Sequence, residues 1–291
     1  MLDLKPLEPS AIPLLREFLD KYPRQSCDYS ISNLLTWGSI YKNQYTLFKD
    51  HLILVNPKYA YVFYPVGPGL EAADLRELID SYGEPEAELI LIPEDWQICA
   101  PGLEKYFEIN HLRDWDDYVY STQKLVELRG KKLAKKKNLI SQYRRTYPNY
   151  HMLPVTPDKH DAVRRFTQKW KRERNAEGIY LNTEFHAICN TLDLWDELPV
   201  EGLIVCHEHL ISAYSIFSRQ NRDMATIHFE KFDPDMKGSA QMINWETAKY
   251  LLPKFKWINR EQDMGLPGLR QNKLSYEPDL LVKFITGKPL P

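Results

Sequence analysis

The sequence predicts an α+β protein made of two halves, in each of which strands are flanked by helices. Short alternating or apolar segments typical of strands occur along the whole chain. Between them lie segments with apolar residues at helical spacing. Each half combines both kinds of segment without an exact internal repeat. A boundary near residue 123 is expected, which predicts domains over residues 1–123 and 124–291.

The composition is that of a globular protein without a dominant charge. The chain has 291 residues, of which 43% are hydrophobic, enough for one large core or two of ordinary size. Its formal net charge is -2, so the molecule as a whole is not a general polyanion binder. Any contact with nucleic acid or lipid must therefore come from a local patch.

Cysteine spacing and the N-terminus indicate the compartment. Cys27, Cys99, Cys189 and Cys206 are widely separated, with no CxxC pair and no spacing typical of zinc or of a redox centre. The N-terminus lacks a signal pattern, and no run approaches the roughly 18 apolar residues of a membrane span. The sequence predicts a cytoplasmic protein with no metal and no transmembrane segment, which would meet a membrane only at its surface.

In the first half, Ile12, Leu15 and Phe18 define one face of a short helix. Alternating and apolar segments then predict neighbouring strands, with Asn56-Pro57-Lys58 as a turn. The further elements expected are strands over 45–55, 59–66 and 88–92 and near 118, and helices over 70–82 and around 96.

In the second half, more of the sequence is helical. A long basic helix is expected from 126 to 147, where Pro148 must end it. The further elements expected are helices over 158–174, 182–194 and 239–252, a strand over 151–155, an antiparallel meander of strands over 203–206, 211–217 and 224–232, and strands over 255–258 and 280–285.

The basic helix is the strongest local charge asymmetry, with no acidic residue between Arg129 and Arg145. Like charges at this spacing destabilise a helix modestly, which suggests a polyanion nearby. Phosphates of a nucleotide cofactor, of tRNA or of an anionic lipid head group fit. A merely soluble helix is the alternative. The cations are Lys131, Lys132, Lys135, Lys136, Lys137, Arg144 and Arg145.

A dense polar cluster follows the strand that ends near Ile258. Charged and amide side chains crowd this segment, and Gly265, Pro267 and Gly268 shape its backbone. Such a cluster predicts a binding site, although a solvated surface loop is the alternative. Its members are Asn259, Arg260, Glu261, Gln262, Asp263, Arg270, Asn272 and Lys273.

Two further groups are candidates. His228 and Glu230 lie two apart on a predicted strand and share a face, where a carboxylate could hold a nucleophile or an amine; satisfied core polar residues are the alternative. Lys237, Gly238 and Ser239 stand between a strand and a helix, where backbone amides could bind an anion; a plain capped turn is equally compatible. The fingerprints GxSxG, P-loop and GxGxxG are absent, so ordinary hydrolase, kinase and dehydrogenase functions lose their best support.

Several segments together resemble a known family, the C-terminal catalytic domain of lysylphosphatidylglycerol synthase, and in particular its stand-alone soluble members. They are Asn33-Leu34-Leu35-Thr36-Trp37, Glu184-Phe185-His186-Ala187-Ile188 with Gly202, Leu203 and Ile204, and residues 259–263 with 265–273. The resemblance spans nearly the whole chain. It implies two tandem acyl-N-acyltransferase (GNAT-like) domains, each a mixed, mostly antiparallel sheet flanked by helices.

The resemblance implies an acyl-group transferase that moves an aminoacyl group from aminoacyl-tRNA to an amine or hydroxyl acceptor, such as a phospholipid head group. Asp235 stands where acetyltransferases usually place Gln or Arg, which disfavours acetyl-CoA. A CoA-dependent N-acyltransferase and a non-catalytic polyanion-binding module remain alternatives.

In this hypothesis Glu230 and Asp263 are catalytic and hold the ammonium or assist deprotonation, while backbone amides beside the third strand of the meander stabilise the oxyanion. The expected substrate-binding residues are His228, Asn259, Arg260, Arg270 and Lys273. The expected phosphate-binding residues are the cations of the basic helix together with Lys237, Gly238 and Ser239.

Overall fold

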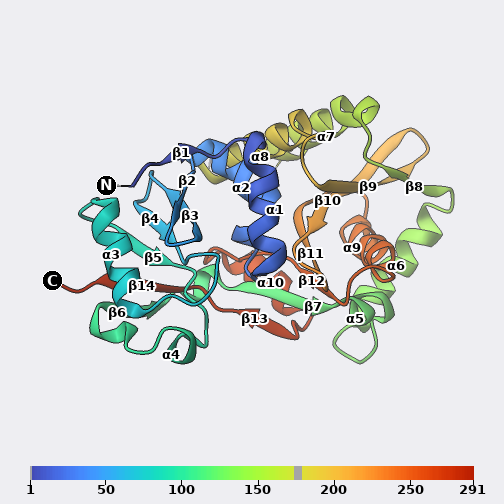
Figure 1. Ribbon diagram of the computed structural model, residues 1–291. Helices are drawn as coiled ribbons and strands as arrows, with labels where there is room; N and C mark the ends of the chain where they lie inside the picture. The colour runs from blue at the N-terminus through green and yellow to red at the C-terminus, as the bar shows by residue number, and fades with distance from the viewer. Residues whose placement is uncertain (1, 174–178) are drawn as a thin grey trace. The chain divides into compact units, whose positions relative to one another are not determined.

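The computed structural model describes residues 2–173 and 179–291, which form two compact units (Figure 1). Unit 1 contains the residues up to Asp117, Gln262–Leu266 and Leu281–Pro291, and unit 2 contains Tyr118–Glu261 and Pro267–Leu280. This grouping differs from a contiguous division at residue 123, because the end of the chain returns to the sheet of unit 1. Arg174, the expected last residue of the helix over 158–174, lies outside the described residues.

Unit 1 is a mixed sheet with helices. Its strands have the order β1-β2-β3-β4-β5-β14-β6, in which β4 and β5 are parallel and the other neighbours antiparallel. The strands are β1 (Lys5–Pro6), β2 (Gln44–Phe48), β3 (His51–Asn56), β4 (Tyr61–Phe63), β5 (Glu88–Ile90), β6 (Phe107–His111) and β14 (Ile285–Pro289). The helices are α1 (Ile12–Lys21), α2 (Ile31–Tyr41), α3 (Ala72–Tyr82) and α4 (Trp96–Cys99).

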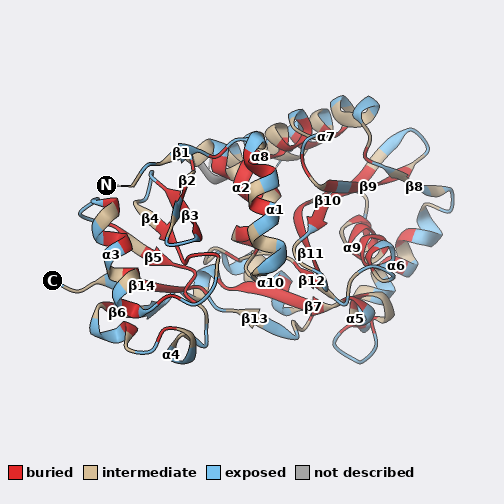
Figure 2. Cartoon of the chain, in the orientation of Figure 1, coloured by how far each residue is buried: buried red, intermediate tan, exposed pale blue. Residues whose placement is uncertain are grey.

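The strand expected over 45–55 is in fact the hairpin β2–β3. Lys49 and Asp50 form its turn and have positive φ, 45° and 62°. A two-residue turn with both φ positive matches the twist of antiparallel strands. This expectation was wrong because Lys49 lacks the usual turn signal of Asn or Gly. All of β3 is buried, at the centre of the unit's core (Figure 2).

Unit 2 repeats the scheme. Its strands have the order β7-β12-β11-β10-β9-β8, in which β11 and β12 are parallel and the other neighbours antiparallel. The strands are β7 (Asp117–Ser121), β8 (Tyr150–Pro154), β9 (Val200–His207), β10 (Leu210–Arg219), β11 (Met224–Phe232) and β12 (Trp257–Asn259). The helices are α5 (Thr122–Glu127), α6 (Ala134–Thr146), α7 (His160–Glu173), α8 (Ile179–Asp193), α9 (Ser239–Leu251) and α10 (Pro267–Leu274). The boundary between the units divides β13 (Leu280–Val282).

The two faces of the unit 2 sheet carry different helices. Successive side chains of a strand point to opposite faces. On β11, Lys231 reaches Glu184 of α8 at 2.6 Å, whereas Glu230 lies 3.5 Å from the amide nitrogen of Asn244 on α9. Helix α9 also packs against α5 and α6, and α7 packs against α8. The face that carries Glu230 is therefore covered by α9 and its neighbours.

The basic helix expected from 126 to 147 begins later, at Ala134 of α6, because residues 126 and 127 are the end of α5 and residues 128–133 are not helical. Leu128 and Gly130 have φ of 47° and 94°, values that an α-helix cannot contain. Lys131 and Lys132 consequently lie in the turn before α6, and the remaining cations lie on α6. Among the described residues, no helix is both long and apolar enough to cross a membrane.

Candidate active site where two strands part

The parallel strands β11 and β12 separate part-way along their length. Within the described chain β12 pairs with only the first three residues of β11, and the last pair joins Thr226 to Asn259. Beyond it β11 continues to Phe232. The register between β10 and β11 skips His228, so β11 carries a bulge beside the opening. Bulges redirect side chains and are common next to functional sites.

Glu230 and Arg260 form an ion pair across this opening. Arg260 donates from Nη2 to Glu230 Oε1 at 2.9 Å, and their side chains are 11% and 14% exposed. The guanidinium carbon lies 5.0 Å from the ring centroid of Tyr276 and 5.9 Å from that of Tyr120. Burial disfavours the charged guanidinium, but Glu230 and the two tyrosines outweigh it and raise the pKa of Arg260. Glu230 and Arg260, two separately predicted site residues, thus lie in direct contact.

Lys136 is the one cation of α6 that turns toward this pair. Its Nζ lies 4.2 Å from the centroid of the Tyr276 ring. Burial, and then repulsion by Arg260 and Lys135, lowers the pKa of Lys136. Arg260 Nη1 is buried and has no hydrogen-bond partner among the described residues. Two cations therefore share one aromatic ring beside a single carboxylate.

A second bridge crosses the opening between His228 and Glu261. His228 Nδ1 lies 3.1 Å from Glu261 Oε1, and its Nε2 lies 2.8 Å from Ser218 Oγ on β10. The side chains of His228 and Glu261 are 1% and 18% exposed. The predicted substrate contact at His228 is therefore enclosed, whereas the carboxylate beside it reaches the surface of the unit.

Lys273 and Asn259 support the segment that follows β12. The Lys273 ammonium is buried and donates to the carbonyls of Arg260 and Glu261, the latter at 3.0 Å. Asn259 is fully buried, and its side-chain oxygen accepts the Glu261 N–H at 2.7 Å. Both side chains therefore support the backbone of this segment, and their expected roles as substrate contacts stay predictions.

Asp263 and Arg270 are not placed with Glu230. Asp263 belongs to unit 1 and is fully buried. Its carboxylate accepts the Gly265 N–H at 2.9 Å and lies 3.7 Å from Arg113 Nη1. A carboxylate so enclosed stabilises a turn, which does not support its expected catalytic role. Arg270 lies half-buried on α10 in unit 2.

Apart from Lys136, the cations predicted for the basic helix are exposed. Lys132 is used in an ion pair with Glu277 at 2.6 Å. The remaining five stand on the turn before α6 or along the helix, where a polyanion could approach them. They are Lys131, Lys135, Lys137, Arg144 and Arg145.

The loop before α9 is closed by internal contacts. A Cβ on Gly238 would stand 2.5 Å from the carbonyl oxygen of Leu139 on α6. Ser239 is buried, its N–H donates to Met236 and its hydroxyl donates to the Asp233 carbonyl at 2.8 Å. Only Lys237 is exposed. The expected phosphate cradle at 237–239 is therefore packed against a helix, which argues against a pyrophosphate there.

Unit 1 holds a polar cluster that sequence spacing did not reveal. The Asp117 carboxylate accepts the Cys27 N–H at 2.7 Å and its thiol at 3.2 Å. Asp28 and Cys27 both accept from the amide of Gln262, each at 3.0 Å. Cys27, Asp28 and Asp117 offer potential ligand atoms within 4.8 Å of one another. Cys27 and Asp117 bond to each other, and Gln262 bonds to Cys27 and Asp28, so the cluster has the geometry of structural support.

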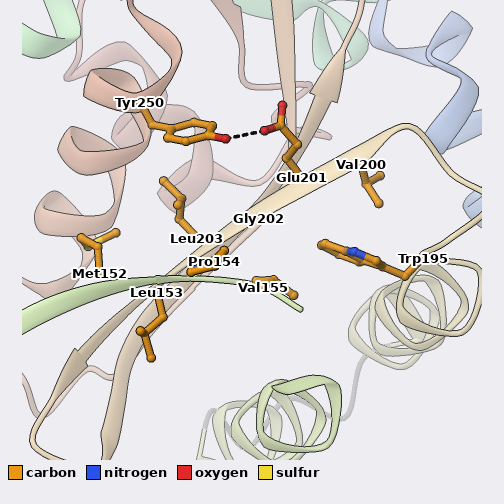
Figure 3. Close-up of a pocket in the computed structure, with 10 residues that line it drawn as sticks. All are labelled: Met152, Leu153, Pro154, Val155, Trp195, Val200, Glu201, Gly202, Leu203 and Tyr250. Atoms are coloured by element: carbon orange, nitrogen blue, oxygen red, sulfur yellow. Dashed lines mark hydrogen bonds between the residues drawn. The ribbon is translucent and has the colours of Figure 1, made fainter. Parts of the chain in front are cut away.

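A pocket lies at the opposite edge of the unit 2 sheet, over β8 and β9 (Figure 3). Its floor is largely apolar, and Tyr250 donates to Glu201 at its rim. None of the predicted site residues lines it. The lining residues are Met152, Leu153, Pro154, Val155, Trp195, Val200, Glu201, Gly202, Leu203 and Tyr250.

Comparison with known families decides the relationship. Residues 19–286 match the model of the family described as "Phosphatidylglycerol lysyltransferase, C-terminal". The chain belongs to this family. A curated relative, an uncharacterized protein of Mycoplasmoides gallisepticum, is 24% identical over 170 residues, which are 57% of this chain and 54% of that protein. The matched region thus spans about half of that relative.

Several solved structures have the same fold as this chain. A conserved protein of unknown function from Bacteroides thetaiotaomicron is 28% identical with a TM-score of 0.91 over 100% of both chains. The C-terminal domain of a protein described as a lysylphosphatidylglycerol synthetase of Agrobacterium fabrum has a TM-score of 0.66 at 13% identity, over 96% of this chain and 91% of that one. A GNAT-family acetyltransferase of Colwellia psychrerythraea has a TM-score of 0.52 at 12% identity, over 99% and 100%. The expected tandem GNAT-like α+β fold is confirmed.

Sequence reasoning missed several residues of the opening. Tyr120 lies on β7 and Tyr276 follows α10, and nothing in their local sequence marks them as site residues. Ser218 lies on the buried strand β10, and nothing distinguishes it in sequence from the other serines there. Glu261 was within the predicted cluster, and its position two residues beyond the last β11–β12 pair is the signal that could have selected it.

Proposed function

We propose that this protein is an acyl-group transferase that moves an aminoacyl group from aminoacyl-tRNA to an amine or hydroxyl acceptor. The observation that supports it most is the parting of β11 and β12, with the Glu230–Arg260 pair across the gap, in a chain of a lysyltransferase family. A gap between strands exposes backbone polar groups that can bind a carbonyl, and amides in such a place stabilise an oxyanion.

The donor would be held in two ways. The five exposed cations before and along α6 suit the phosphates of tRNA, since such contacts supply most of the sequence-independent affinity for nucleic acid. Glu230, 14% exposed, suits the ammonium of the aminoacyl group. Arg260 fixes Glu230 in place, and Lys136 adds a second cation beside it. In this proposal Asp263 stabilises a turn in unit 1.

The acceptor class is suggested by the family. A phospholipid head group fits the family description, and the protein would then meet the membrane from its surface. Acyl-CoA is a weaker donor candidate, because the groups at Gly238 and Ser239 that would cradle its pyrophosphate are engaged internally. A module that binds polyanions without catalysis is the remaining alternative.

A transfer assay tests the proposal. Unfractionated tRNA charged with radiolabelled amino acids would be incubated with the protein and with either phosphatidylglycerol vesicles or soluble amines. We expect label to pass to the lipid or amine fraction, and Glu230→Gln to lower that rate by about 10-fold or more through loss of a charge-assisted hydrogen bond. Glu104→Gln, at an exposed position of unit 1, serves as the control. Tight tRNA binding with no transfer to any acceptor would contradict the enzyme and favour the binding module.

A further inference from the structure

The opening between β11 and β12 is bridged twice, by Glu230 with Arg260 and by His228 with Glu261. The last ladder pair is Thr226 with Asn259. His228 on β11 and Glu261 in the segment after β12 each lie two residues beyond it. His228 Nδ1 lies 3.1 Å from Glu261 Oε1. The bridge therefore stands just beyond the point where the two strands stop pairing.

The bridge extends into a chain of three polar side chains. Ser218 Oγ meets His228 Nε2 at 2.8 Å, and His228 Nδ1 meets Glu261 Oε1. Ser218 is 3% exposed and the His228 side chain 1%. This hydroxyl–imidazole–carboxylate order is that of a nucleophilic triad, but an enclosed Ser218 has no room for an acyl ester. Only the Glu261 end, 18% exposed, reaches the surface.

The backbone of Glu261 is held at each polar group. Its N–H donates to Asn259, and its carbonyl accepts from Lys273 at 3.0 Å and from the Tyr118 N–H at 3.2 Å. These bonds fix a left-handed conformation, φ 59°. Such a conformation costs a glutamate of the order of 1–2 kcal/mol. Strained conformations are kept where surrounding contacts stabilise them, and they are frequent at functional sites.

The two carboxylates of the opening differ in their partners. Glu230 faces a guanidinium, a fixed cation that does not exchange protons, so this carboxylate is suited to binding. Glu261 faces an imidazole, which can share a proton with it. A group that must accept and return a proton needs the second kind of partner.

We propose that Glu261 is the proton acceptor of the transfer, with His228 and Ser218 as positioning residues; this rests on the proposed function. The acceptor nitrogen or oxygen forms a bond to the aminoacyl carbonyl carbon, and its proton passes to the Glu261 carboxylate. The bond from that carbon to the ribose oxygen of tRNA breaks with its electron pair on the oxygen. That oxygen takes the proton back from Glu261, so charge and atoms balance without a redox step.

Chemical rescue tests this role. Glycine adopts φ 59° without strain, so Glu261→Gly removes the carboxylate while it preserves the backbone bonds. We expect a loss of about 10²–10⁴-fold in single-turnover transfer, the usual contribution of a general base. Added formate should restore transfer in proportion to its concentration. Glu208→Gly is the matched control, because Glu208 also has a positive φ, 54°, and its side chain is 71% exposed in a hairpin.

A second variant distinguishes a structural role of the Glu261 side chain from its role as proton acceptor. Glu261→Gln retains the bulk of the side chain, and it should lower kcat with little change in KM. Wild-type transfer together with full activity of both variants would overturn the role of Glu261 and leave the proposed function intact. A loss in Glu261→Gly that formate does not restore, with a raised KM in Glu261→Gln, would also overturn it. Absence of transfer by the wild-type protein would instead reject the proposed function.

Discussion

Gly238 and Gly130 adopt almost the same backbone conformation in different surroundings. Their φ values are 93° and 94°. A Cβ at Gly238 would meet the Leu139 carbonyl oxygen at 2.5 Å and Tyr143 Cβ at 3.1 Å, whereas one at Gly130 would meet nothing within 4 Å. The strand-to-helix turn before α9 therefore needs glycine for close contact with α6 as well as for its conformation.

A pair of alanine variants separates these two needs. Gly130→Ala should cost about 1–2 kcal/mol of unfolding free energy, from the conformation alone. Gly238→Ala should cost about 1–3 kcal/mol more, because Leu139 belongs to helix backbone that cannot move aside freely. Urea denaturation followed by far-UV circular dichroism measures both. Equal losses would show that α6 does not pack on Gly238 as described.

At the scale of elements, α6 divides its cations between two environments. Lys136 turns inward to Tyr276, while Lys135 and Lys137 on either side remain exposed. A helix places residues one position apart about 100° around its axis, so one charged run can serve an interior site and a surface together. The position of a lysine within this run of cations therefore does not show whether it faces the opening or the solvent.

The exposed cations predict a measurable salt dependence. Replacement of Lys131, Lys135 and Lys137 by Gln should reduce the slope of log K against log salt for tRNA binding by about 2–3, since each phosphate contact contributes about 0.7–0.9. Filter binding across a salt series measures it. The control replaces exposed lysines of unit 1, namely Lys5, Lys21 and Lys105. An unchanged slope in the α6 variant would show that tRNA binds elsewhere.

The elements were predictable where local sequence determines them. Apolar runs predicted the meander β9–β10–β11, because its strands are buried on both faces along most of their length. The break between α5 and α6 was missed, since Leu128 adopts φ 47° without being glycine, and only Gly130 marked it. The opening could be predicted only in part. Arg260 and Glu230 are 30 residues apart, and their contact depends on where β12 leaves β11.

At the scale of the whole molecule, each unit contains a parallel strand pair with antiparallel neighbours on both sides, β4–β5 in unit 1 and β11–β12 in unit 2. The neighbour of the parallel pair differs between the units. In unit 2, β12 is followed by β7, which precedes it in the chain. In unit 1, β5 is followed by β14, from the end of the chain. Unit 1 therefore needs the final residues to complete its sheet.

This dependence predicts an unequal response to trimming the two ends. Strand β14 lies between β5 and β6, pairs Thr286 with Ile90 and with Asn110, and buries Ile285 in the core. Removal of residues 285–291 should expose the amides of β5 and β6 to hydrogen exchange, because a strand interior to a sheet supplies bonds on both sides. Removal of residues 2–6 deletes the edge strand β1 and the core contacts of Leu2 and Leu4, but no ladder bond of β5 or β6, and should leave that protection unchanged. Exchange measured by mass spectrometry on peptides from β5, β6, α9 and β11 tests this, with the unit 2 peptides as internal reference. Full protection of β5 and β6 in the shorter chain would mean that unit 1 closes its sheet without β14.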